Sequence, residues 1–196
     1  MELHELIERS DGALAKQFLL AMPGITDERF ERAVIFLAAH SADGALGFVL
    51  SDPAELDPDD MFRRAGLEDD LREGAAGDIE VLRGGPVEAS RGFVVHSADY
   101  TSAATVKIDE DIALTSTLDV LRALARGHGP KRALLALGYA AWGAGQLEDE
   151  LRENVWLTVE TEPLHVLRMG ATERYDGLLA VMGIAPGALS AAAGNA

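Results

Sequence analysis

The sequence predicts an α+β fold in a single domain. Short apolar runs bounded by turn residues are typical of strands, and fewer segments have the spacing of an amphipathic helix. The two kinds of segment do not alternate strictly, which favours hairpins mixed with helices over a doubly wound α/β sheet. With 196 residues, 48% of them hydrophobic, the chain can bury one sizeable core.

The N-terminal part is predicted to lead into the first strand of the sheet. Residues 1–15 are polar and are expected to form an N-terminal extension. The apolar run 16–22 predicts a strand, and Pro23-Gly24 is a common turn dipeptide that ends it. Thr26 is then expected to cap a short helix that ends at Arg32.

A central hairpin and an acidic excursion follow. The continuous apolar run 33–40 predicts a strand buried on both faces, and 45–50 returns as its partner. In 51–78, ten of 28 residues are Asp or Glu, so we expect a solvated surface excursion with a short helix near 59–65. A calcium loop fails there because Asp57 lacks the glycine that an EF-hand needs at its sixth position.

The second half of the chain is predicted to add short strands and three helices. The strands are expected at 79–83, 91–97, 105–108, 112–114, 132–139 and 156–160. The helices are expected at 118–126, 146–154 and 172–182, and 164–168 is either a strand or a helical turn. The domain is thus expected to span 16–190, with a final turn at 186–190 and a frayed tail at 191–196.

Capping residues and apolar spacing define these helices. The first is capped by Thr115-Ser116-Thr117, has Leu118, Leu121 and Leu124 on one face, and ends at Gly127 in a left-handed conformation. In the second, Leu147, Leu151 and Val155 are expected to face inward, and Glu148 and Arg152 have the spacing of an i,i+4 ion pair. Thr172 is expected to cap the third.

Composition argues against several kinds of binding and catalytic site. The net charge of −16, with only three lysines, disfavours direct binding to nucleic acid or to anionic membrane surfaces. The absence of cysteine excludes disulfides, thiolate zinc sites and a cysteine nucleophile. The polar, acidic start does not look like a signal peptide, and no apolar run is long enough for a membrane span, so we expect a cytoplasmic protein.

The glycine-rich stretch from Gly138 to Gly145 is a weak phosphate-loop match. Its spacing echoes a phosphate loop, but Ala144 and Gly145 stand where the lysine and the hydroxyl residue belong. The dinucleotide fingerprint is also incomplete, because Glu148 replaces its third glycine. We therefore favour a tight turn between a strand and a helix, with no cofactor.

Histidine and serine residues give no catalytic or metal pattern. His40 and His96 each end an apolar strand and could face each other across one end of the sheet, with Asp43 or Asp99 as a third ligand. No ligand spacing supports this, and we favour ordinary strand-end histidines and no metal site. Ser116 belongs to a helix cap, and no nucleophile elbow occurs.

The candidate binding site consists of Tyr139, Trp142, Gln146 and Glu148, which follow one another along 20 residues that contain both tryptophans. Aromatic side chains could form the wall of a pocket and the polar residues could orient a ligand. Glu153 and Asn154 lie one to two helical turns further on. Core packing of the aromatics, with the carboxylates on a solvated helix face, is the alternative that we favour.

The chain resembles the bacterial AlgH/YqgE family over about residues 16–195. The resemblance lies in the segments Phe18–Gly24, Phe30–Ile35, Gly84–Val87, Arg91–His96, Thr115-Ser116 with Asp119, Gly138–Glu148, Glu153-Asn154 and Trp156-Leu157. It implies an α+β fold built around a small barrel-like sheet with surrounding helices. It implies no settled activity, and members are often labelled transcriptional regulators.

Three positions depart from the family pattern. Ala141 replaces a usual glycine, 50–53 read Leu-Ser-Asp-Pro where Asn-Arg-Pro is typical, and Asn195 replaces a histidine near the end. If that arginine or that histidine serves a reaction in relatives, this protein lacks it.

Three functional hypotheses follow. The first is a non-catalytic regulatory or interaction protein that binds a small molecule or a protein partner near 138–148. The second is an enzyme with a site near 139–148 that uses Glu148 or His96 as acid or base. The third is a DNA-binding regulator, which the net charge disfavours.

Overall fold

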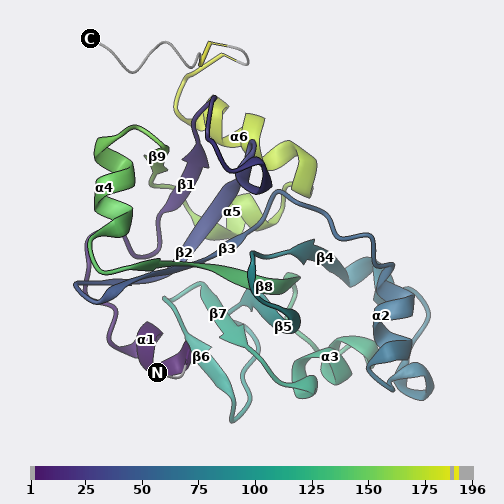
Figure 1. The fold of residues 1–196 in the computed structure, drawn as a ribbon. Coiled ribbons are helices and arrows are strands. Elements are labelled where there is room, and N and C mark those ends of the chain that lie inside the picture. The colour runs from purple at the N-terminus through teal and green to yellow at the C-terminus, as the bar shows by residue number, and fades with distance from the viewer. Residues whose placement is uncertain (1–2, 186–187, 190–196) are drawn as a thin grey trace.

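The structure is a computed structural model that describes residues 3–185 and 188–189 (Figure 1). It shows one domain, a curled and mainly antiparallel sheet in the form of a half-barrel, with helices around it (Figure 1). The predicted α+β fold is confirmed. The predicted tail at 191–196, Asn195 included, lies outside the described residues, as does most of the predicted turn at 186–190.

Nine strands form the sheet in the described part of the chain. They are β1 (Phe18–Ala21), β2 (Val34–Ser41), β3 (Gly44–Val49), β4 (Ile79–Arg83), β5 (Val87–Ser97), β6 (Thr105–Lys107), β7 (Ile112–Thr115), β8 (Ala133–Gly143) and β9 (Trp156–Val159). The order across the sheet is β6-β7-β5-β8-β3-β2-β1-β9, and β4 pairs with β8 in parallel. The predicted central hairpin is present as β2 and β3, in antiparallel register.

Strand β8 joins the two halves of the sheet. One edge of β8 pairs with β5, and the other pairs first with β4 along residues 133–137 and then with β3 along residues 140–143. Gly138 has φ +76° between these two stretches, and a Cβ there would lie 2.4 Å from the Gly85 carbonyl oxygen. Only glycine fits this bulge. The predicted strand 132–139 therefore does not end at a glycine-rich turn but continues to Gly143.

The bulge also changes which way the side chains of β8 point. Leu134 and Ala136 pack in the main core, so regular alternation would direct Ala140 there as well. After the bulge Tyr139 packs against the main core instead, whereas Ala140 and Trp142 join a second apolar cluster on the other face. This shift separates two neighbouring aromatic residues.

The helices cover the faces and ends of the sheet (Figure 1). They are α1 (Leu3–Glu8), α2 (Pro58–Arg64), α3 (Leu118–Ala125), α4 (Gln146–Arg152), α5 (Pro163–Leu167) and α6 (Arg174–Val181). Residues 164–168, predicted as strand or helical turn, are thus mostly helical. No helix in the described ranges combines the length and the apolar character that a membrane crossing requires.

Three predicted helix caps are wrong. Asp27, and not Thr26, caps the 3-10 turn Glu28–Phe30, because its carboxylate accepts the Arg29 N–H. In α3 the buried face is that of Val120, Leu121 and Leu124, and Leu118 is half exposed. No cap hydrogen bond is made by the hydroxyl of Thr117, which precedes α3.

At the third predicted helix, Thr172 does not act as a cap. It lies inside the 3-10 turn Ala171–Glu173, which precedes α6 and follows Gly170 at the cap position.

The acidic excursion is less solvated than predicted. Its helix α2 is capped by Asp57, and it buries Met61 and Phe62. Leu67 is buried as well, and all three join an apolar cluster under α3. The carboxylates face solvent while the few apolar side chains cover one face of the sheet, and the charge content alone did not indicate this. The N-terminal segment also packs against the domain, because Ile7 of α1 is buried in the main core.

Candidate functional site

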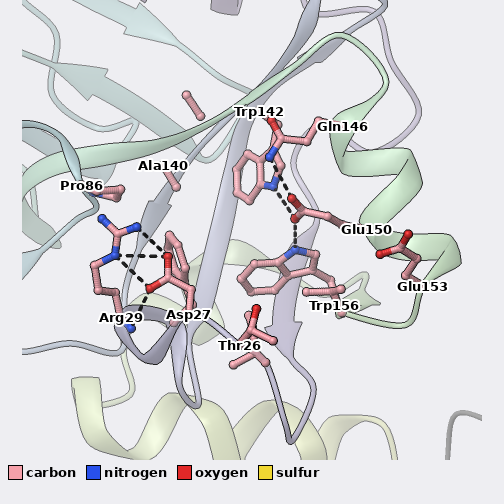
Figure 2. Close-up of a pocket in the computed structure, with 14 residues that line it drawn as sticks. Thr26, Asp27, Arg29, Pro86, Ala140, Trp142, Gln146, Glu150, Glu153 and Trp156 are labelled. Carbon is pink, nitrogen blue, oxygen red and sulfur yellow. Dashed lines mark hydrogen bonds and ion pairs between the residues drawn. The ribbon is translucent and has the colours of Figure 1, made fainter.

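A pocket of about 440 Å³ lies beside the C-terminal half of β8 (Figure 2). Strand β8 contributes Trp142, helix α4 contributes Gln146 and Glu150, and β9 contributes Trp156. The opposite wall includes Arg29 and its neighbours in the first 3-10 turn. We call this the indole pocket.

Glu150 organises the indole pocket. Its Oε2 accepts the indole N–H groups of Trp142 at 2.9 Å and Trp156 at 2.7 Å. Its Oε1 accepts the Gln146 Nε2–H at 2.9 Å. Gln146 is itself oriented, since its Oε1 accepts the Gly143 backbone N–H at 3.0 Å. An indole nitrogen can only donate, so a carboxylate is a suitable common acceptor for both rings.

The aromatic rings of the pocket are fixed by one another. The two buried indoles meet edge to face with centroids 6.0 Å apart, and Phe30 meets Trp156 in the same manner at 5.7 Å. Such T-shaped pairs are worth about 0.5–1.5 kcal/mol beyond the area that they bury. With Glu150 holding both nitrogens, the indoles form a preorganised wall.

The wall opposite Glu150 carries a balanced ion pair (Figure 2). The Arg29 guanidinium contacts both carboxylate oxygens of Asp27, at 2.6 Å from Nη2 and 2.9 Å from Nε. This hydrogen-bonded arginine lowers the pKa of Asp27, and the same carboxylate raises the pKa of Arg29. Both groups are exposed, so the pair positions the side chains more than it stabilises the fold.

The helical period of α4 divides its polar residues between two environments. Gln146 and Glu150 are four residues apart and share the face that lines the pocket. Glu148 lies on another face, where its Oε1 is 2.7 Å from the His40 Nε2. This hydrogen bond, followed by one to a backbone N–H, lowers the pKa of Glu148. Arg152 makes its ion-pair contact with Asp149, at 2.5 Å, and its charge makes the smallest of the contributions to the lowered pKa of Glu148, so the predicted Glu148–Arg152 interaction is favourable but is not a direct contact.

Tyr139 does not line the indole pocket. Its ring packs edge to face on Phe93 in the main core, at 5.6 Å between centroids. Its hydroxyl reaches the Glu88 carboxylate at 3.5 Å, and burial, ahead of the charge of Glu88, raises the pKa of the phenol. The four candidate residues from the sequence are thus split: Trp142 and Gln146 lie together, whereas Tyr139 and Glu148 face elsewhere.

His96 is fully buried far from the pocket. Its Nδ1 lies 2.9 Å from the Ser97 carbonyl oxygen and its Nε2 lies 2.9 Å from the Thr115 hydroxyl. The carbonyl can only accept, so Nδ1 carries the proton and Nε2 accepts from Thr115. Burial lowers the pKa of His96, and the hydrogen bond to Ser97 opposes this in part. All ring nitrogens are occupied by structural partners.

The two histidines cannot share a metal ion. His96, in β5, pairs with Ala133 at the start of β8. His40, in β2, pairs with Ala45 of β3, and Ala45 pairs with Trp142 near the end of β8. At about 3.3 Å per residue, those two positions on β8 are roughly 25–30 Å apart. Nor do the described residues contain any other group of three potential ligands.

Glu150, Trp156 and Arg29 are the pocket residues that the sequence did not reveal. Trp156 lies in the aromatic stretch, but its strand position carried no sign that it would meet Trp142. Glu150 resembles an ordinary exposed helix residue, and Arg29 lies more than a hundred residues away. The spacing of Gln146 and Glu150 at i,i+4, between two tryptophans, is the signal that could have found the site.

Comparisons with known proteins place this fold and sequence in a family. A family model described as AlgH-like (DUF179) matches residues 18–187. A UPF0301 protein of Rhizobium meliloti (strain 1021) is 46% identical, covering 99% of this chain and 98% of its own length. A UPF0301 protein of Rhodospirillum rubrum is 44% identical, covering 97% of this chain and 98% of its own length.

Solved structures agree with these matches. The solution structure of the AlgH protein from Pseudomonas aeruginosa has a TM-score of 0.75 and 36% identity, covering 95% of this chain and 98% of that one. A crystal structure of a protein from Corynebacterium diphtheriae shares the fold, with a TM-score of 0.67, 17% identity, and coverage of 91% of this chain and 93% of that one. The chain belongs to the AlgH-like family.

Proposed function

We propose that this protein is a non-catalytic regulatory or interaction protein whose partner, a small molecule or a segment of another protein, binds in the indole pocket. The observation that carries the proposal is Glu150, which holds both indole nitrogens and Gln146 at the edge of a pocket of about 440 Å³. A mostly preformed concave site with aromatic walls and a few oriented polar groups is the usual form of a binding site.

The chemistry of the site supports binding over catalysis. Both oxygens of Glu150 already accept hydrogen bonds from the protein, and Gln146 is bonded at both ends of its amide. The two residues that the sequence suggested as acid or base, His96 and Glu148, do not line the pocket. A general base needs to reach its substrate within hydrogen-bonding distance, and neither residue is placed to do so.

Two finer aspects belong to the same proposal. We place the protein in the cytoplasm, which is compatible with a chain that has no cysteine. We also propose that any effect on transcription passes through a partner and not through DNA, because the net charge is −16. The expected result is no salt-sensitive binding to duplex DNA at physiological ionic strength.

The indole N–H signals in nitrogen–proton NMR spectra test the proposal. The chain has only two tryptophans, and both line the pocket, so two signals report on it. We expect members of a fragment library to shift both signals, and Trp142→Phe to weaken those fragments at least several-fold. Tyr139→Phe, on the other face of β8, is the control and should leave them bound. A library that shifts neither signal would contradict the proposal.

A further inference from the structure

The indole pocket carries a negative charge that the protein does not balance. The three donors to Glu150 are neutral N–H groups, and they satisfy its hydrogen bonds without cancelling its charge. Within the described ranges no lysine or arginine pairs with Glu150 or with Glu153, the other acidic residue of that side of the pocket. Asp27 and Arg29 cancel each other on the opposite wall.

The aromatic wall adds to the preference for a cation. The faces of indole rings are electron-rich and attract ammonium and guanidinium groups, by about 0.5–2 kcal/mol depending on exposure. Here the two indoles stand beside an uncompensated carboxylate (Figure 2), and Phe30 packs against one of them. The site therefore favours an organic cation over an anion.

The backbone of β8 is unpaired on the edge beside this pocket. The pairing of β5 with β8 ends at Val87 and Tyr139, and no described strand continues along that edge toward Gly143. The Trp142 carbonyl points to β3, since a Cβ on Gly44 would lie 2.3 Å from it. By alternation, Ala141 and Gly143 direct their backbone groups to the other edge.

The Gly143 N–H points away from β3, as this alternation requires, and Gln146 links this edge of β8 to the Glu150 carboxylate. Gly143 donates to Gln146 Oε1, and Gln146 Nε2 donates to Glu150, so one side chain touches both features. Ala141 is exposed, and no strand in the described residues pairs with it on this edge. The edge and the charged pocket form one continuous surface.

We propose that the occupant is an extended peptide segment of a partner protein that pairs with β8 at Ala141 and places a lysine or arginine side chain against Glu150. The segment would add a short antiparallel or parallel strand to the sheet, which is a recurring mode of peptide recognition. Side chains on one of its faces would point to the indoles, as those of Ala140 and Trp142 do. Charge complementarity with a protein of net charge −16 favours a basic segment. This inference rests on the proposed function.

Selection from a random heptapeptide display library against the full chain tests the inference. We expect enriched peptides to share a lysine or arginine within a run of β-forming residues. The best peptide is then synthesised in three forms: unmodified, with the cation replaced by glutamine, and with alternate backbone nitrogens methylated. Binding is measured by calorimetry, and we expect each of the two changes to weaken it at least ten-fold.

Variants of the protein separate charge from fold. Glu150→Gln removes the charge while its amide oxygen can still accept both indole N–H groups, and it should weaken the unmodified peptide about ten-fold. Asp149→Asn is the matched control, because it removes one charge from an exposed face of the same helix and should change binding less than two-fold. Far-UV circular dichroism and thermal melting check that each variant is folded.

The outcomes distinguish this inference from the proposed function. Enriched peptides that lack a cation, or that bind Glu150→Gln as well as the native protein, would overturn the charge argument. Peptides that tolerate backbone methylation would overturn the strand pairing. If no peptide is selected but small fragments shift the indole signals, the pocket binds small molecules and the peptide inference fails while the proposed function stands. If neither binds, both fail.

Discussion

Glu80 and Glu150 are two carboxylates that each organise their surroundings, and they differ in whether a cation balances the charge. Glu80 accepts the Arg174 Nη2–H at 2.6 Å and the Ala171 backbone N–H at 2.9 Å. Arg174 is fully buried and also donates to the carbonyls of Leu50 and Val166. The charges of Glu80 and Arg174 therefore balance each other within the protein, and their hydrogen bonds hold α6 against the sheet.

Glu150 has as many hydrogen bonds as a structural carboxylate needs but no cation, and it faces a pocket. Burial lowers the pKa of Arg174, while Glu80 opposes this, so the Glu80 charge is balanced internally. The comparison shows that hydrogen bonding alone does not separate structure from function. The unbalanced charge beside an open surface is what marks Glu150 as a candidate for binding. Four predictions test this difference.

The largest expected effect is loss of the balanced pair. Arg174→Ala removes donors to two buried carbonyls and leaves Glu80 without its cation, so we expect a loss of about 3–5 kcal/mol in the free energy of unfolding. Urea unfolding measures it. Arg152→Ala is the control, since its pair with Asp149 is exposed and should be worth less than about 1 kcal/mol. Equal losses in the two variants would show that Arg174 is not a structural anchor.

A smaller loss is expected when Glu150 is truncated. Glu150→Ala leaves two buried indole N–H groups without an acceptor, and each unsatisfied donor costs about 1–3 kcal/mol unless water replaces the carboxylate. We expect a total loss within that range, because water can enter from the pocket. Glu150→Gln should lose less than half as much. Glu153→Ala, in the same pocket, is the control, because the Glu153 side chain has no hydrogen bond to lose. If Glu153→Ala lowered the free energy of unfolding as much as Glu150→Ala does, the hydrogen bonds of Glu150 would not be what stabilises this region.

Fluorescence quenching can measure the unbalanced charge without a ligand. Both tryptophans line the pocket, so caesium and iodide ions sample its potential. At about 0.15 M salt, a unit charge about 6 Å away in water changes the local concentration of a monovalent ion by a little less than two-fold, upward for a cation and downward for an anion. Glu150→Gln should therefore lower the ratio of caesium to iodide quenching by about two- to three-fold. Asp149→Asn should change the ratio much less. An unchanged ratio in Glu150→Gln would mean that another group sets the potential.

The sequence predicted most of the fold because hydrophobic runs and turn residues are local signals. The hairpin at 33–50 was recognisable from its continuous apolar run, and Gly127 has the left-handed conformation expected at a helix end. The length of β8 was not predictable in this way. A glycine at position 138 predicts a turn that ends the strand, and only its close approach to Gly85 shows that it is a bulge within the strand. The sequence also did not show which apolar residues of α3 are buried, since Leu118, which is half exposed, and Val120, which is buried, are both apolar.

The candidate site was predicted in part, because contacts between distant elements decide it. Trp142 and Gln146 are brought together, but the bulge at Gly138 turns Tyr139 to the other face, and helical spacing turns Glu148 to His40. Glu150 acquires its position from Trp156, which follows α4 and returns beside Trp142. A residue whose role depends on three separate elements carries no local signal.

The smallest expected effect concerns Glu148, the carboxylate on the other face of α4. Its pKa lies below the usual value, chiefly because of the hydrogen bond from His40. A carboxylate whose pKa is lower in the folded state contributes stability above its unfolded pKa, and that contribution disappears as the pH falls through the folded pKa. The side chain is 41% exposed, so we expect only a few tenths of a kcal/mol.

The pH dependence of a single substitution isolates this contribution from the many other acidic groups. The native protein should be more stable than Glu148→Gln near neutral pH, and the difference should shrink as the pH falls from about 5 toward 3. Urea unfolding at several pH values measures it. In a His40→Ala background the same substitution should show a clearly weaker trend, because the hydrogen bond that contributes most to the lowered pKa is gone. A trend of unchanged size without His40 would assign the lowered pKa of Glu148 to the helix backbone and Arg152, and His40 would then have no part in the charge of α4.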